Sequence, residues 1–331
     1  MDKPAGHAAA SMQDIADALG ISRATVSNAL RGKGRLSEET RRQVHEKAAE
    51  LRFSPSGLGR ALRTGRTQSF AIILPDFRMP LFAEFARAFA MAARKRDLAM
   101  TVADSLGSLE MQTEHLRDMA ARGMDALVLV PMRGSRLEGL ALSRPLTVVD
   151  AASNPLNAVS SDHRQGGALV ARHLIGLGHR DVLLLGASGQ DSRVNALRLQ
   201  GMREVFDAQG ITTRHMALPP THEAARDGLA GWNPGPVTAI AAAYDALAVG
   251  AVMALTARGL SVPQDISVAG FDDTVWGRIV APALTTIRQD LQTVAELALA
   301  HAMGERTAPD LVPVTLVPRC STAAAPSARK G

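Results

Sequence analysis

The stretch MQDIADALGISRATVSNALRGKGRLSEETRRQV, residues 12–44, decides how the first part of this 331-residue chain folds. It contains two pairs of apolar residues at helical spacing, Ile15 with Leu19 and Val26 with Leu30. Gly20 lies between the pairs, and glycine suits the left-handed position that ends a helix. Two helices of about eight residues, joined by a short turn containing glycine, are typical of a helix-turn-helix.

The second helix of this pair carries polar side chains on the side opposite its apolar residues. Ser22 is placed to cap its first turn. The polar side presents one Arg and several short side chains: Arg23, Ala24, Thr25, Ser27 and Asn28. Such side chains suit the base edges and phosphates of a major groove. A small helical packing module with a solvated basic face is the alternative interpretation of the same spacing.

The distribution of charge separates these two interpretations. Residues 1–66 contain twelve Lys or Arg and seven Asp or Glu, so they carry all of the chain's net charge of +5. The remaining 265 residues contain 25 basic and 25 acidic residues and are neutral. A basic segment attached to a neutral body is the electrostatic pattern of a phosphate-binding headpiece, which favours DNA binding.

Composition indicates an ordinary globular protein. The chain is 46% hydrophobic and 21% charged, and it is long enough for the headpiece and one or two larger domains. Cys320 is the single cysteine, which excludes an internal disulfide and fits a reducing compartment. No apolar run has the length of a signal sequence or of a membrane span. We therefore expect a cytoplasmic protein that has no membrane partner.

A third helix and a linker follow the helix-turn-helix. Ser37 is a natural N-cap, and the apolar spacing of the third helix continues to about Leu51. The next segment, FSPSGLGRALRTGRTQ at 53–68, contains one Pro and three Gly. Its helix propensity is low, so a flexible linker is the default interpretation. Leu58 and Leu62 would nevertheless share an apolar face if a short helix were stabilised there.

From residue 70 onward, short apolar runs alternate with helical ones. The predicted strands are 70–74, 99–103, 126–130, 147–149, 182–185, 239–242, 266–269 and 284–287. The predicted helices are 81–96, 110–122, 165–177, 196–209, 247–258 and 291–303. This alternation predicts an α/β fold with parallel, doubly wound sheets in two lobes. Ligands of such folds bind beyond the carboxyl ends of strands, so polar residues that follow strands are candidates for a site.

Several longer motifs agree in order and spacing with a known family. They are DIADALGISRATVSNALRGKGRLSEETRRQV, SPSGLGRAL, HLIGLGHR, RLQGM, ISVAGFDDT and PALTTIRQD. From residue 12 to about residue 320, the chain resembles the lac repressor (LacI/GalR) family. The resemblance implies a homodimeric transcription factor, usually a repressor, that binds a palindromic operator. It also implies a core like that of periplasmic sugar-binding proteins, in which the chain crosses three times between two lobes.

The resemblance also implies domain boundaries. Residues 1–54 would form the helix-turn-helix headpiece, and residues 55–67 a hinge helix and linker. Residues 68–322 would form the two-lobed core that binds an effector and dimerises. Residues 323–331 are expected to be a disordered tail. No heptad repeat follows Cys320, so the Ala- and Pro-rich segment 321–331 is not expected to form a tetramer.

Positions in the headpiece and hinge receive DNA-binding roles from the resemblance. Arg23, Ala24 and Asn28 match base-reading positions, of which Ala24 offers only a methyl contact. The expected phosphate contacts are Ser22, Thr25, Ser37 and Thr40. Leu62 matches a residue that wedges into the minor groove and kinks the duplex. The hinge glycines predict that this helix folds only on DNA.

Positions in the core receive effector-binding roles in the same way. Phe82 matches an apolar contact, and the matching polar contacts are Asp150, Arg198, Asp272 and Gln289. Asp272 and Arg198 also have structural interpretations. Asp272 can cap its turn, and Arg198 can pair with an acidic side chain. Trp276, four residues beyond Asp272, is expected near the ligand.

Tyr244, the only tyrosine, departs from the family pattern. After the strand predicted at 239–242, sugar-binding members commonly have Asn followed by Asp. The present chain has Tyr244 followed by Asp245 at these positions. A phenol ring favours stacking on a planar or apolar effector over a hydroxyl array. The alternative is that Tyr244 fills the cleft and closes the pocket.

Three functions are compatible with these observations. The first is a DNA-binding regulator that is switched by a small-molecule effector, such as a sugar or another metabolite. The second is a regulator with a degenerate pocket that is controlled by a protein partner or is constitutive. The third is a binding protein or enzyme of the same α/β shape, which the basic headpiece argues against. No nucleophile–base arrangement, phosphate-cradling loop or metal-ligand spacing is evident, so we expect no catalytic residue, cofactor or metal.

Overall fold

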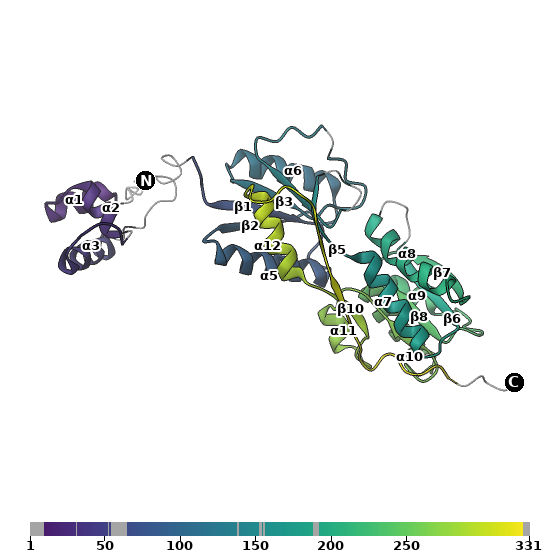
Figure 1. Cartoon of the computed structure of the whole chain (residues 1–331). Helices are drawn as coiled ribbons and strands as arrows, with labels where there is room; N and C mark the ends of the chain where they lie inside the picture. Colours follow the sequence, from purple (N-terminus) through teal and green to yellow (C-terminus); the bar gives the residue numbers. More distant parts are fainter. Residues whose placement is uncertain are drawn as a thin grey trace, which may run out of the picture. The chain divides into compact units, whose positions relative to one another are not determined.

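The chain folds into two compact units, residues 1–67 and residues 68–331 (Figure 1). The structure is a computed structural model that describes residues 10–30, 32–51, 53, 65–137, 139–151, 154, 156–187 and 192–326. The expected hinge helix, with Leu62, lies largely outside the described residues.

The first unit is the predicted headpiece of three helices (Figure 1). They are α1 (Met12–Leu19), α2 (Arg23–Leu30) and α3 (Glu38–Glu50). A capping box between Ser11 and Asp14 begins α1, and Gly20 ends it at φ +63°, in the left-handed region. One apolar residue from each helix is fully buried at the centre of the headpiece: Ile15, Val26 and Val44.

The second unit begins with a lobe built on a parallel six-stranded sheet, which we call the N-lobe. Its strand order is β11-β5-β4-β3-β1-β2. The bounds are β1 (Ser69–Leu74), β2 (Ala99–Asp104), β3 (Ala126–Leu129), β4 (Leu146–Val149), β5 (Asn157–Ser161) and β11 (Asp310–Val312). Helices α5 (Pro80–Lys95) and α12 (Leu291–Ala302) pack on one face, and α6 (Leu109–Ala121) packs on the other.

The other lobe, the C-lobe, has a parallel four-stranded sheet in the order β7-β6-β8-β9. The strands are β6 (Asp181–Ala187), β7 (Thr212–Leu218), β8 (Ala239–Ala242) and β9 (Ser267–Ala269). Helices α7 (His163–Gly176) and α8 (Arg193–Asp207) cover one face. Helices α9 (His222–Leu229) and α10 (Asp245–Ala257) cover the other, and the short α11 (Val275–Ile279) contacts α10.

The chain passes between the lobes three times, as the resemblance implied. The crossings follow β5, β10 (Thr286–Gln289) and β11. Strand β10 pairs with β12 (Val314–Val317) in a two-stranded antiparallel sheet. The yellow C-terminal part of the chain is seen to run from one lobe to the other in Figure 1. The expected two-lobed α/β core is therefore confirmed.

The structure differs from the sequence predictions at polar or short elements. The strand predicted at 284–287 begins two residues later, as β10. Strands β5, β7, β11 and β12 and helices α9 and α11 were not predicted. β5 reads NAVSS and β7 reads TTRHMAL, and β7 alternates between exposed and half-buried residues at the edge of its sheet. Neither has the continuous apolar run that marks a central parallel strand.

The expectation of a disordered tail from residue 323 is wrong for its first residues. The backbone N–H of Ala323 donates to the hydroxyl of Ser267, and the ring of buried His179 bonds to the carbonyl of Ala323. Ala325 also donates to the carbonyl of Leu177. These bonds hold residues 323–326 against the C-lobe, and residues 327–331 lie outside the described ranges.

Close packing of α7 against α8 requires glycine at position 167. A Cβ atom there would lie 2.0 Å from the backbone oxygen of Arg198. We expect Gly167→Ala to lower the free energy of unfolding by about 1–3 kcal/mol, because the helices must separate. Urea unfolding of the whole chain measures this. Gly176→Ala, at a site with open space on the same helix, is the control and should not destabilise the protein. Equal stability of the two variants would contradict the packing argument.

Candidate functional site

A cavity of about 380 Å³ lies between the two lobes. Residues that follow strands line it: Asp76 after β1, Pro131 after β3, Asp150 after β4, Tyr244 after β8 and Asp272 after β9. The carboxyl ends of strands from both sheets thus meet at this cavity, which is where ligands of parallel α/β folds bind.

A chain of buried polar side chains forms the floor of the cavity and joins the lobes. Nε2 of His163 bonds to Oδ1 of Asp150 at 2.9 Å, from the start of α7 to the end of β4. Nε of Arg198 donates to Nδ1 of the same histidine at 3.2 Å, so the ring proton lies on Nε2. The guanidinium also donates to Oδ1 of Asp272 and to the carbonyl of Ala243, each at 2.7 Å. Asp150, Arg198 and Asp272 of this group line the cavity directly.

Aromatic rings enclose the guanidinium of Arg198. Its Cζ lies 3.8 Å from the ring centroid of Phe271 and 4.9 Å from that of Tyr244. The Arg198 side chain is consequently only 1% exposed. Cation–π attraction is strongest for such desolvated cations, so the two rings help to hold the guanidinium in place.

The two carboxylates of the floor occupy strained backbone positions. Asp150 has φ +60° and Asp272 has φ +115°, both in the region that favours glycine. Strain of this kind costs on the order of 1–3 kcal/mol per residue and concentrates at functional sites. Both residues follow a strand and line the cavity.

Burial and charge act differently on these two carboxylates. Burial alone would raise the pKa of Asp150, but the bond to His163 and the charge of Arg198 outweigh it and lower the pKa. For Asp272, burial dominates and raises the pKa, although Arg198 opposes the shift. Asp272 therefore holds a proton more readily than Asp150 does.

The walls of the cavity are mostly apolar. Phe82 on α5 and Trp276 on α11 line it from opposite lobes, and Tyr244 lines it without filling it. The hydroxyl of Tyr244 accepts a bond from Arg133 of the N-lobe at 3.3 Å. Gln289 donates to Oδ1 of Asp272 at 2.8 Å but lines an adjacent cavity of about 300 Å³. Six of the seven residues expected around the effector thus line the main cavity.

The sequence assigned no ligand role to four residues that contact the predicted ones: His163, Phe271, Arg133 and Ser192. His163 is the first residue after a crossing between lobes, and Phe271 directly precedes Asp272. Ser192 caps α8 and lies 3.4 Å from the hydroxyl of Tyr244. Position relative to the crossings would have identified His163, whereas the others depend on tertiary packing.

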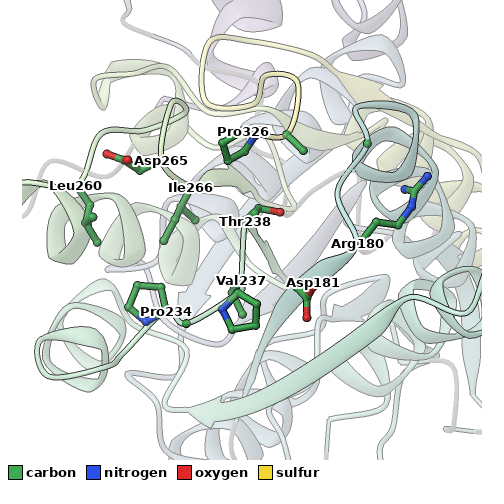
Figure 2. Close-up of a pocket in the computed structure, with 13 residues that line it drawn as sticks. Arg180, Asp181, Pro234, Val237, Thr238, Leu260, Asp265, Ile266 and Pro326 are labelled. Carbon is green, nitrogen blue, oxygen red and sulfur yellow. The ribbon is translucent and has the colours of Figure 1, made fainter. Parts of the chain in front are cut away.

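A larger cavity, of about 530 Å³, lies elsewhere on the C-lobe (Figure 2). Its walls include Asp181 at the start of β6, Thr238 before β8 and Ile266 before β9. These are the amino ends of parallel strands, and Pro326 of the C-terminal segment also lines the space (Figure 2). The interlobe cavity has the strained carboxylates and the residues of both lobes, so we assign the ligand site there.

The headpiece presents two similar groups of hydroxyls. Ser22 caps the backbone N–H of Thr25 at the start of α2, and their hydroxyls lie 2.9 Å apart. Ser37 caps Thr40 at the start of α3 in the same way, with hydroxyls 2.8 Å apart. Helix N-termini attract phosphate through their free N–H groups and dipole. Arg23 and Ala24 are exposed on the first turn of α2, and Asn28 is half-buried on its second.

Two other kinds of site are not found within the described ranges. No group of three or more His, Cys, Asp or Glu side chains is placed there to hold a metal ion. Among the helices that the structure describes, none combines the length and apolar character needed to cross a membrane.

A helix-turn-helix unit attached to a two-lobed core with an interlobe cavity defines a DNA-binding transcriptional regulator. Comparison with known proteins agrees. Residues 11–56 match the family described as bacterial regulatory proteins, lacI family, and residues 171–322 match a periplasmic binding protein-like domain. The chain is 30% identical to the HTH-type transcriptional repressor PurR of Yersinia enterocolitica, over 96% of this chain and 98% of that protein.

Two further comparisons support this assignment. The ribose operon repressor of Haemophilus influenzae is 29% identical over 88% of this chain and 90% of its own length. The solved lac repressor dimer bound to operator and the anti-inducer ONPF superposes with a TM-score of 0.83 at 25% identity. That match covers 96% of this chain and all of the other. The chain belongs to the LacI family of DNA-binding transcriptional regulators.

One buried carboxyl group lies beside the site without lining the cavity. Asp245, at the start of α10, accepts bonds from the backbone N–H of Thr274 at 2.7 Å and the hydroxyl of Thr286 at 2.6 Å. Burial, and after it the charge of Asp272, raise its pKa to about 7, although these hydrogen bonds oppose the shift. The group therefore links the start of α10, α11 and the crossing strand β10.

This shift makes stability depend on pH. The folded protein holds the proton of Asp245 up to about pH 7, whereas the unfolded chain loses it near the ordinary aspartate pKa of 3.8. The free energy of unfolding should therefore fall as pH rises through this range, by at most about 1.4 kcal/mol per pH unit. Urea unfolding of the wild type and Asp245→Asn isolates the contribution. A difference between the two proteins that is constant with pH would contradict it.

Proposed function

We propose that this protein is a transcriptional repressor whose affinity for a twofold operator is switched by a small molecule in the interlobe cavity. The observation that carries the proposal is the floor of that cavity, where Asp150 of the N-lobe and Asp272 of the C-lobe are joined through His163 and Arg198. A ligand that touches both lobes favours the relative lobe positions that fit it best. It can shift the equilibrium only by its difference in affinity between the two arrangements.

The headpiece supports the DNA-binding part of the proposal. We assign base reading to Arg23, Ala24 and Asn28 of α2, and minor-groove wedging to Leu62. The proposed phosphate contacts are the hydroxyl pairs at the two helix N-termini: Ser22, Thr25, Ser37 and Thr40. We retain residues 1–54 as headpiece, 55–67 as hinge and 68–322 as core.

The LacI-family repressor works as a homodimer, and we propose that α5, α10 and α11 contribute to the contact between copies. Large apolar side chains are exposed there: Met91, Met253, Val275 and Ile279. Met91 lines the same small cavity as Arg278, the neighbour of Ile279 in sequence. Scattered apolar residues are ordinary, but exposed apolar groups gathered on adjoining helices mark interaction surfaces.

We further propose a cytoplasmic regulator without catalytic activity. The relatives are transcriptional repressors, and DNA is reached in the cytoplasm of a bacterium. The cavity's charged groups are paired with one another rather than arranged as nucleophile and base.

The alternative is a regulator with a degenerate pocket that is controlled by a protein partner or is constitutive. The open volume beside Tyr244 favours the effector-controlled function. Titration of the operator with and without a panel of metabolites, combined with thermal unfolding, tests it. Compounds that raise the melting temperature should also change operator affinity, and should change the emission of Trp276. A panel that shifts neither operator affinity nor melting temperature would favour the alternative.

Base reading by the recognition helix predicts a position-specific defect. Arg23→Ala should weaken operator binding by about 1–3 kcal/mol and relax the preference at one base pair per half-site. Thr25→Val, which removes a proposed phosphate contact, should weaken binding to all sequences alike. Binding measured across a set of operator variants separates the two effects. An unchanged base preference in Arg23→Ala would exclude its proposed role.

Dimerisation through α11 predicts a linked loss of assembly and affinity. Ile279 is 73% exposed, and Ile279→Asp should shift sedimentation toward the monomer because burying the new charge is costly. Operator affinity should fall with it, since two headpieces are needed for a twofold site. Leu311→Asp, at a residue 64% exposed on β11, is the matched control and should remain dimeric. A dimeric Ile279→Asp protein would place the interface elsewhere.

A further inference from the structure

At the polar floor of the interlobe cavity, the hydrogen-bond donors of Arg198 have partners within the protein, whereas some carboxylate acceptors do not. Arg198 is 1% exposed and donates to His163, Ala243 and Asp272. Among the described residues, every hydrogen bond to Asp150 and to Asp272 ends on Oδ1. Neither Oδ2 atom has a hydrogen-bond partner there, and both residues line the cavity. A ligand that reaches this floor therefore meets free carboxylate oxygens.

The charges at the floor also favour a positively charged ligand. The two carboxylates of the floor share the guanidinium of Arg198, because His163 accepts from Arg198 on Nδ1 and donates to Asp150 through Nε2. The second guanidinium that lines the cavity, that of Arg133, donates to the hydroxyl of Tyr244. Burial raises the pKa of Asp272, so a further positive group at its free oxygen would stabilise the ionised form. An uncompensated negative charge in a largely apolar cavity is costly, and a cationic ligand removes that cost.

The walls suit a cation on a flat body. Phe82 approaches from the N-lobe, and Tyr244 and Trp276 approach from the C-lobe. The faces of aromatic rings attract organic cations, and several rings around one cavity act together. Arg198 already occupies one face of the Tyr244 ring, so that ring shields the guanidinium from the ligand.

Building on the proposed function of this cavity, we infer that its effector is an organic cation, an amine or amidine carried on a flat or apolar body. Its N–H groups donate to the free Oδ2 atoms of Asp150 and Asp272, while the body packs among the aromatic walls. Arg198 keeps its three bonds within the protein and positions Asp272. A sugar phosphate or a carboxylate brings a further negative charge to this floor and should bind more weakly than an organic cation, and an uncharged sugar offers hydroxyl donors but no positive charge.

The test compares probes that differ in charge at constant shape. The full chain carries Trp232→Phe, so that Trp276 is the single tryptophan. Benzamidine and tyramine are the cationic probes, benzamide and benzoate are the matched neutral and anionic ones, and glucose and glucose 6-phosphate represent sugars. Titration of Trp276 emission should give saturable binding of both cations, at least tenfold tighter than any of the other four. Benzamidine should also change operator affinity.

Variants connect the binding to the two carboxylates. Asp150→Asn and Asp272→Asn should each weaken benzamidine binding at least tenfold and reduce its preference over benzamide. The two sites are separate, so one variant remains informative if thermal unfolding shows that the other is destabilised. The matched control is Asp227→Asn, an exposed acid on α9 that pairs with Arg226, and it should bind benzamidine as the wild type does.

Three results would overturn the inference: tighter binding of a sugar or of benzoate, no binding of either cation, or benzamidine binding that is unchanged in both variants. These results leave the proposed function intact if any metabolite of the panel still changes operator affinity. A panel without any such compound would instead contradict the proposed function itself.

Discussion

The buried guanidinium of Arg198 is the group on which the rest of the cleft depends. It is held between two aromatic rings and by bonds to a carbonyl, an imidazole and a carboxylate. Removal of one partner of such a buried pair typically costs about 3–5 kcal/mol, because a charge is left without compensation. The position of Arg198 requires α8 to approach α7 closely, which Gly167 and Gly201 permit by lacking a Cβ atom. The position of the buried charge in this core thus depends on the close packing of the two helices.

The same group of side chains lies where the chain crosses between lobes. His163 follows the first crossing and Gln289 precedes the second, and both contact the carboxylates of the floor. A change in the position of one lobe must therefore lengthen or shorten these bonds. Packed interfaces respond to such changes by switching between discrete arrangements rather than by deforming continuously. A small ligand that binds at the floor can therefore change the relative positions of the two lobes.

The sequence was sufficient for the headpiece because the headpiece is encoded locally. Helical spacing, the serine caps and Gly20 all lie within a few residues of the element that they define. Central strands of the core were also predictable, since their apolar runs are continuous. Edge strands such as β7 were not, because half their residues face solvent and read as polar. Helix α11 carries Trp276 but is only five residues long, which is too short for a helical spacing of apolar residues to be recognised in the sequence.

The candidate site was predictable in part, and for a different reason. Residues at strand ends, such as Asp150 and Asp272, could be found because the fold dictates that strand ends converge. The partners of those residues come from tertiary packing, which no local pattern encodes: Phe271 stacks on Arg198, and His163 connects the lobes. The role of Arg198 illustrates the consequence. Resemblance to sugar-binding relatives assigns it to the effector, but Tyr244 shields it here and its bonds are made within the protein. A fold preserved across a family therefore leaves the ligand chemistry to a few side chains, and in this chain those side chains present acceptors and aromatic faces.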